Sequence, residues 1–338
     1  MERALVLADA GLTTKDWVQL AVEAEQAGFE AVYAMEAGRT SFVPLGAIAT
    51  ATSRVRLGSY AANAYARTPA LTALGSLDLD ELSDGRFTLC IAPGNHHINE
   101  RLHGITMERP ATKMAEYVSI LRSMLAARAG ETFSYDGRMH AVGGWTASKD
   151  GRPVPVMMAG TQPAMLRAAG RHADGVALGV LITPDYLREQ ILPVVHGAAA
   201  AADRDPASLR VLMAASTAVH EDKEAARYSV RRMICMLFSP LPHPYYEFLL
   251  REQGYGAVAD AAARHVPAGE YDAAMAAIPD ELADRLSVSG PVADCEKSIA
   301  RYDGMVDEIL FISAAGPARG SGETWADATR RLMPLAGA

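Results

Sequence analysis

Short apolar runs alternate with longer amphipathic stretches from the start of the chain. Four runs predict buried strands, at 3–8, 29–35, 55–62 and 87–92. Three stretches between them predict helices, at about 14–27, 42–51 and 69–82. Thr13 and Gly28 are residue types that commonly start and end a helix, and Thr68-Pro69 is a typical start for the third. This alternation is typical of a parallel sheet, open or closed.

The alternation continues towards the C-terminal end. Further strands are predicted at 154–158, 175–179, 209–219 and 306–313. Further helices are predicted at about 109–127 and 163–172, and from 183, 221, 290 and 323 onward. The polar, glycine-rich link at 130–151 is expected to include a short hairpin.

One segment interrupts this rhythm. Residues 239–288 begin with Ser-Pro-Leu-Pro-His-Pro and continue into an alanine-rich helical stretch. We interpret them as a mostly helical insertion before strand eight, over the barrel mouth. Eight strand–helix units then predict a single α/β domain over 1–338, a closed (β/α)8 TIM barrel. A doubly wound open sheet with a helical appendage is the alternative.

Two of the predicted strand ends have an unusual composition. In parallel α/β folds ligands bind at the carboxyl ends of the strands, which here include 59–67 and 92–100. The first reads Ser-Tyr-Ala-Ala-Asn-Ala-Tyr-Ala-Arg, with small residues where a buried strand normally has branched ones. Small side chains allow a flat ligand to lie against the backbone. Close packing against a helix would need the same residues, so composition alone leaves both interpretations open.

Another candidate site element reads Met-Met-Ala-Gly-Thr-Gln-Pro, at 157–163. A strand that ends in Ala-Gly-Thr and turns into a helix presents free backbone N–H groups and the positive end of a helix dipole, which favour a phosphate. The next strand end, 177–180, is expected beside it. Two adjacent strand ends commonly share one phosphate in such barrels.

The chain resembles a known superfamily at two motifs. Leu-Gly-x-x-x-x-Asn-x-Tyr-x-Arg-x-Pro at 57–69 and Leu-Asp-x-Leu-Ser-Asp-Gly-Arg-Phe at 79–87 are similar to the luciferase-like superfamily of flavin- and deazaflavin-dependent oxidoreductases. Within it, the methylenetetrahydromethanopterin reductase branch is the most similar. Asn63, Tyr65 and Arg67 match that branch, whereas Thr68 stands where it usually has histidine.

The resemblance implies a cofactor whose ring lies across the strand ends. It favours coenzyme F420, a deazaflavin, with FMN as the alternative. It also implies a non-proline cis peptide at Tyr60–Ala61, on which the ring would lie. The residues expected to bind the cofactor are Tyr60, Ala61, Ala62, Asn63, Gly94, Asn95, Gly160, Thr161, Gln162, Ala177, Leu178, Gly179 and Val180.

The candidates for acid–base chemistry are Glu36, Asn63, His96 and Glu100. Glu36 ends the second strand, where relatives often have an Asp-His pair, and the histidine is missing here. After a one-residue shift, Glu100 aligns with a carboxylate that donates a proton in sugar-phosphate dehydrogenases of the superfamily. Each candidate could equally be a solvated loop residue, and so could His97. Adjacent histidines in a loop seldom reach one metal ion, so no metal is predicted.

Composition excludes several other classes. The formal charge is −8, and no basic block indicates a nucleic-acid or membrane partner. Cys90, Cys235 and Cys295 are far apart and have no metal-ligand spacing. No apolar run approaches 18 residues. We therefore expect a soluble, cytoplasmic enzyme, and the family's habits imply a homodimer.

The main hypothesis is an F420-dependent reductase or dehydrogenase that transfers a hydride between the deazaflavin ring and a small organic substrate. The divergent insertion and the missing histidine favour a substrate from specialised metabolism. An FMN-dependent monooxygenase or reductase is one alternative, and a non-catalytic flavin-binding barrel is another. An aldolase-type barrel is disfavoured because no lysine is expected at a strand end. The pocket-lining candidates, which could equally be packing residues, are Tyr65, His243, Tyr245, Tyr246 and Phe248.

Overall fold

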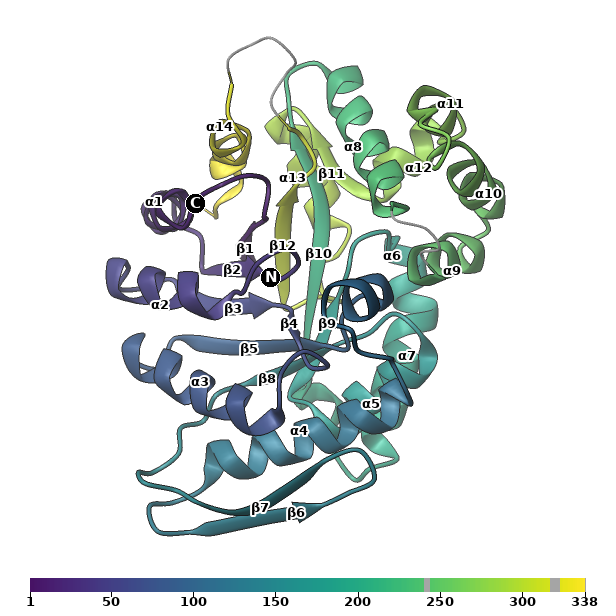
Figure 1. The fold of residues 1–338 in the computed structure, drawn as a ribbon. Coiled ribbons are helices and arrows are strands. Elements are labelled where there is room, and N and C mark those ends of the chain that lie inside the picture. The colour runs from purple at the N-terminus through teal and green to yellow at the C-terminus, as the bar shows by residue number, and fades with distance from the viewer. Residues whose placement is uncertain (240–243, 317–322, 338) are drawn as a thin grey trace.

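The computed structural model describes residues 1–239, 244–316 and 323–337. Within these ranges, eight parallel strands close into a barrel (Figure 1). In ring order they are β1 (Glu2–Leu7), β2 (Ala31–Met35), β3 (Arg56–Tyr60), β5 (Phe87–Ala92), β8 (Val156–Ala159), β9 (Gly175–Leu178), β10 (Arg210–Val219) and β12 (Glu308–Ser313). β10 pairs with both β9 and β12, and β12 pairs with β1, which completes the ring. The predicted TIM barrel is confirmed, and the open sheet is excluded.

Helices surround the barrel. They are α1 (Thr14–Ala27), α2 (Phe42–Ala51), α3 (Pro69–Leu82), α4 (Pro110–Ala126), α5 (Pro163–His172), α6 (Pro184–Tyr186), α7 (Leu192–Ala200), α8 (Lys223–Leu237), α13 (Val292–Ala300) and α14 (Trp325–Arg330). Thr13 and Asp16 form a reciprocal capping box at the start of α1. Gly28 ends α1 with φ 101°, and the Phe29 amide still donates to the Ala24 carbonyl. The second strand therefore starts two residues later than predicted.

A charged cluster fills the amino end of the barrel. The Glu308 side chain is 1% exposed and accepts hydrogen bonds from Arg56 (3.1 Å), Arg210 (3.2 Å) and the Tyr33 hydroxyl (3.1 Å). Glu2 pairs with both arginines from the rim. Because charged and aromatic side chains occupy this end, the carboxyl end of the strands is left for a ligand.

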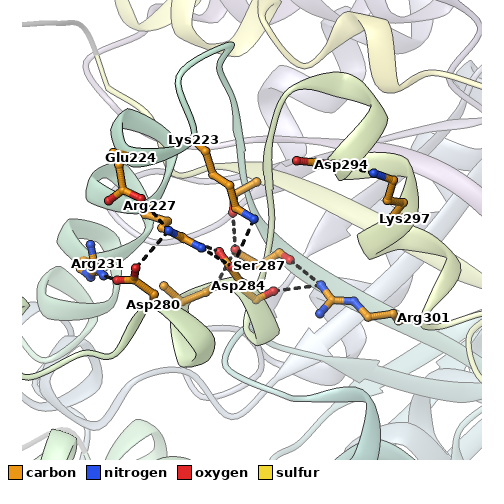
Figure 2. Close-up of polar contacts among 12 residues, drawn as sticks. Lys223, Glu224, Arg227, Arg231, Asp280, Asp284, Ser287, Asp294, Lys297 and Arg301 are labelled. Carbon is orange, nitrogen blue, oxygen red and sulfur yellow. Dashed lines mark hydrogen bonds and ion pairs between the residues drawn. The ribbon is translucent and has the colours of Figure 1, made fainter.

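The predicted insertion forms four short helices, α9 (Pro244–Glu252), α10 (Gly256–His265), α11 (Tyr271–Ala276) and α12 (Asp280–Arg285), beside α8 (Figure 1). It ends in a strand, β11 (Ser287–Gly290), which pairs with the end of β10 and which the sequence pattern did not predict. Ion pairs fasten α12 to the barrel helices (Figure 2). Arg227 of α8 donates to Asp284 (2.7 and 2.9 Å) and to Asp280 (3.0 Å), and Arg231 pairs with Asp280.

The segments that follow β3 and β5 also differ from simple strand-to-helix connections. A two-residue strand, β4 (Ala62–Asn63), continues β3 and pairs with β5. The loop after β5 contains one π-helical turn, Ile98–Leu102. The expected hairpin is confirmed as β6 (Thr132–Asp136) and β7 (Ala141–Thr146). In the described residues, no helix combines the length and the apolarity needed to cross a bilayer.

Candidate active site

A cavity of about 260 Å³ opens at the carboxyl ends of β3, β5, β8 and β9, with α9 on its far side. Many of the predicted cofactor-binding residues line it, namely Tyr60, Ala61, Gly94, Asn95, Gly160, Thr161, Gln162, Ala177 and Gly179. Ala62, Leu178 and Val180 are buried behind this wall. The structure therefore brings together residues from four separate strand ends.

The floor of this cavity is the Tyr60–Ala61 peptide, which is cis, as the resemblance predicted. The Tyr60 side chain crosses the barrel, and its hydroxyl donates to the Leu178 carbonyl at 2.6 Å. Burial raises the pKa of the Tyr60 phenol well above its usual range. Tyr60 therefore stays a neutral donor that links β3 to β9 beneath the cavity.

The turn into α5 also lines the cavity. Helix N-termini carry backbone N–H groups without intrahelical acceptors, together with a positive dipole end. A Cβ at Gly160 would lie 2.8 Å from the Met165 Cβ, so this turn requires glycine. A Cβ at Gly179, on the facing loop, would meet no protein atom within 4 Å, so this residue borders open space. No Lys or Arg is among the described lining residues, so backbone groups would have to hold a phosphate here.

Glu36 lies at the end of β2 with its side chain 10% exposed. Its carboxylate accepts hydrogen bonds from the Arg67 guanidinium (3.1 and 3.2 Å), the Asn63 amide (3.0 Å), and the Ser41 amide and hydroxyl (3.0 and 2.9 Å). Burial by itself raises the pKa of the Glu36 carboxyl, but the hydrogen bonds outweigh burial and the net pKa is lowered. Glu36 is thus held ionised, which suits a positioning residue better than a proton donor.

Asn63 is buried, and both polar atoms of its side chain form hydrogen bonds. Its Nδ2 donates to the Asn99 Oδ1 at 2.7 Å, and its Oδ1 accepts from the Tyr65 amide. The Asn99 Nδ2 in turn donates to the Pro93 carbonyl. A Cβ at Gly94 would lie 2.7 Å from the Asn63 side chain, and Gly94 has φ 80°. Sequence reasoning missed Asn99 because its partner lies 36 positions away and no local motif marks it.

His96 and Glu100 lie on the rim, at the π-helical turn. His96 Nε2 and Glu100 Oε1 are 3.1 Å apart, and the two side chains are 44% and 43% exposed. Neither residue lines the cavity described above. His97 donates its backbone N–H to the Asn95 side chain. In the described ranges, no three His, Cys, Asp or Glu side chains are grouped closely enough to hold a metal ion.

Only some of the predicted aromatic pocket residues line the cavity. Tyr245 and Tyr246 of α9 line the cavity. Tyr65 is buried, and its hydroxyl donates to the Glu108 carbonyl at 2.5 Å instead. Phe248 packs against the core, and His243 lies outside the described residues. The insertion therefore supplies one aromatic wall of the cavity.

A second cavity of about 420 Å³ adjoins the first and shares Ala61, Gly94 and Asn95 with it. Its volume lies in the range of roughly 300–1,000 Å³ that is typical of small-molecule sites. Its other lining residues are Glu36, Ala37, Gly38, Arg39, Thr40, Asn63, Ala66, Arg67, Leu71, Ile98, Leu102 and His103. The two cavities meet at the end of β3, so molecules bound in each could touch there.

Comparisons with known proteins agree with this geometry. A 5,10-methylenetetrahydromethanopterin reductase of Methanolobus tindarius is 28% identical over 299 residues, which cover 87% of this chain and 89% of the relative. The structure of the coenzyme F420-dependent tetrahydromethanopterin reductase of Methanopyrus kandleri has a TM-score of 0.78 at 19% identity, covering 98% of this chain and 97% of that one. An F420-dependent secondary alcohol dehydrogenase, solved with an F420–acetone adduct, has a TM-score of 0.77 at 16% identity and covers 100% and 99%.

The model of one protein family extends over almost the whole barrel. Residues 4–308, from the first strand to the start of the last, match the family described as luciferase-like monooxygenase. The match includes the cis-peptide floor, the turn into α5 and the insertion. The resemblance inferred from the two motifs is thereby confirmed, and the chain belongs to the luciferase-like monooxygenase family of oxidoreductases.

Proposed function

We propose that this protein is an F420-dependent oxidoreductase that transfers a hydride between the deazaflavin ring and a small organic substrate. The observation that carries the proposal is the lining of the first cavity, which combines the small residues Ala61 and Gly94 with a phosphate-type turn at 160–162. That arrangement suits a flat ring joined to a phosphate. Similarity to a methylenetetrahydromethanopterin reductase favours F420, and FMN in the same cavity is the alternative.

The residues present fit such a cofactor. Ala61 and Gly94 have little or no side chain, so a ring can approach the backbone closely. Gly160, Thr161 and Gln162 would hold the phosphate through backbone N–H groups at the start of α5. Bound there, the cofactor would supply hydride chemistry, and the protein would orient it and exclude water.

The remaining candidate residues then take different roles. Glu36 and Asn63 position the strand end beneath the ring, because both are held by hydrogen bonds to neighbouring protein groups. His96 and Glu100 form a paired acid and base on the rim, next to Asn95. We assign the proton transfer at the substrate to this pair.

The test is a titration of purified protein with F420 and, separately, with FMN, followed through cofactor fluorescence. Tight binding of F420 with weak binding of FMN is expected. A preference for FMN would replace the proposal by the monooxygenase alternative. Binding of neither would refute the assignment of the first cavity. If the protein bound a cofactor but oxidised no reduced cofactor in assays with carbonyl or alkene substrates, the non-catalytic barrel would be favoured.

A further inference from the structure

The second cavity differs from the first in chemical character. The first has aromatic and small residues and no described cation, whereas the second contains two arginines, Arg39 and Arg67, beside one carboxylate, Glu36. On one side, the apolar side chains of Leu71 and Leu102 line it. The cavity thus offers a polar region and an apolar wall within the same space.

The two arginines are in different electrostatic situations. Arg67 is neutralised by Glu36 at 3.1 Å, and it also donates to the Thr40 hydroxyl at 2.6 Å. Arg39 donates only to neutral acceptors, the Leu12 carbonyl (2.9 Å) and the Thr14 hydroxyl (2.6 Å). Among the described residues, no carboxylate lies within ion-pair distance of Arg39.

The Arg39 guanidinium is also held in place. It lies 4.3 Å from the ring centroid of Trp17, which is completely buried. Two of its five N–H groups are used by the neutral acceptors, which leaves further donors for a ligand. A fixed guanidinium with donors to spare is well suited to a carboxylate, which accepts two parallel hydrogen bonds.

The position of Arg39 separates this charge from the anionic groups of the cofactor. The proposed phosphate turn at 160–162 lines only the first cavity and Arg39 lines only the second, whereas Ala61, Gly94 and Asn95 line both. An anion at Arg39 would therefore bind outside the cavity proposed for the cofactor.

We infer that the second cavity binds the substrate and that the substrate is a small carboxylate, held at Arg39 with its apolar part against Leu71 and Leu102. The role as substrate rests on the proposed function, because the reacting atom would have to meet the ring at Ala61 and Asn95. Neutral molecules of the same shape would bind more weakly, since they lose the charge-assisted hydrogen bonds.

The test compares benzoate with benzamide, which have the same shape and differ in charge, on the full-length protein without cofactor. Calorimetry measures both affinities, and the guanidinium of Arg39 lies over the Trp17 ring, so a Trp17→Phe variant shows which part of any change in tryptophan fluorescence comes from this site. We expect benzoate to bind about tenfold more tightly than benzamide, and increasing salt to remove the difference. Equal binding of the two compounds would overturn the inference without the need for any variant.

Variants locate the site. Arg39→Met should lower benzoate affinity about tenfold and leave benzamide unchanged, and Arg39→Lys should retain part of the benzoate affinity because it keeps the charge. Arg54→Met is the matched control, because Arg54 is an exposed arginine that lies outside both cavities. If Arg39→Met bound benzoate as tightly as the wild type, the assignment would be refuted, because the anion would then bind elsewhere.

The cofactor titration separates the two proposals. Binding of F420 without any preference for benzoate would overturn the carboxylate inference and leave the proposed function intact. If neither cofactor bound but benzoate was still preferred in a way that depends on Arg39, the proposed function would be overturned. The carboxylate site alone would then be supported.

Discussion

The Glu36 carboxylate illustrates how a single residue can hold a strand end in place through its hydrogen bonds. Its two oxygens accept hydrogen bonds from Arg67, from the Asn63 amide and from Ser41. These contacts tie β2 to the two-residue strand β4 that follows the cis peptide. The chemistry of the cavity therefore depends on Glu36 through geometry, and its charge is needed to neutralise Arg67.

Glu36→Gln should destabilise the protein by about 3 kcal/mol, because Arg67 would keep a largely buried charge without its partner. Urea denaturation at pH 7 measures the loss. The folded pKa of Glu36 is lowered, so its stabilisation is present above the ordinary pKa of about 4.3 and is lost as the pH falls through the folded value. The difference between wild type and variant should shrink in acid. A constant difference down to pH 3 would contradict this prediction.

Substitutions at two glycines separate an effect on stability from an effect on cofactor binding at the proposed phosphate site. Gly160→Ala should lower both stability and cofactor affinity, because its Cβ would clash with Met165. Gly179→Ala should keep wild-type stability, because its Cβ meets no protein atom, but should weaken cofactor binding where it enters the cavity. Thermal melting and cofactor titration measure the two effects. Unchanged affinity in Gly179→Ala would argue against a phosphate between the turn at 160–162 and the facing loop that carries Gly179.

Among the elements, the loop after β9 receives contacts from several directions. Gln253, just after α9, donates to the Leu181 carbonyl (2.8 Å) and accepts from the Thr183 amide (2.9 Å). The Tyr302 hydroxyl donates to the Ile182 carbonyl (3.1 Å). Since α9 supplies Tyr245 and Tyr246 to the first cavity, Gln253 couples that aromatic wall to the loop of the proposed phosphate site.

Gln253→Met should weaken cofactor binding about 5- to 30-fold, the effect of losing 1–2 kcal/mol of positioning energy. The side chain keeps nearly the same size but loses its hydrogen bonds to the 181–183 backbone. Fluorescence titration measures the affinity. Glu252→Gln is the matched control, because Glu252 is exposed and precedes Gln253 in the chain. Equal affinity in both variants would show that this contact does not position the site.

At the scale of the whole molecule, ion pairs and strand pairing attach the insertion to the barrel. Arg227 links α8 to Asp280 and Asp284 of α12, and β11 adds backbone pairing to β10. The pKa of the Asp284 carboxyl is lowered by the hydrogen bond from Arg227. Ion pairs and backbone hydrogen bonds thus attach the C-terminal part of the insertion, α12 and β11, to the barrel.

The predicted homodimer also belongs to this scale. Val43 of α2 and Leu82 of α3 are 69% and 51% exposed, although both are large and apolar. Covering such side chains would favour association. Light scattering at micromolar concentration is expected to give about twice the chain mass of 36.0 kDa. A mass of one chain that persists on concentration would defeat the prediction.

Periodicity and local motifs determined much of this protein. The alternating runs predicted the closed barrel, and Gly160-Thr161-Gln162-Pro163 marked the turn into α5, because both depend on neighbouring residues. The two motifs indicated the family and the cis peptide at Tyr60–Ala61. Each strand, helix or turn behind these predictions is encoded within roughly a dozen consecutive positions.

Tertiary structure alone decided how the site residues are used. Glu36 is saturated by Arg67 and Asn63, which lie about thirty positions away, and Glu100 pairs with His96 on the rim. Asn99 and Gln253 each bond a partner far along the chain, namely Asn63 and the 181–183 backbone, and β11 forms where β10 offers it a free edge. Local patterns specify where strands and turns form, whereas the ionisation and the orientation of a side chain depend on neighbours that only the closed barrel brings together.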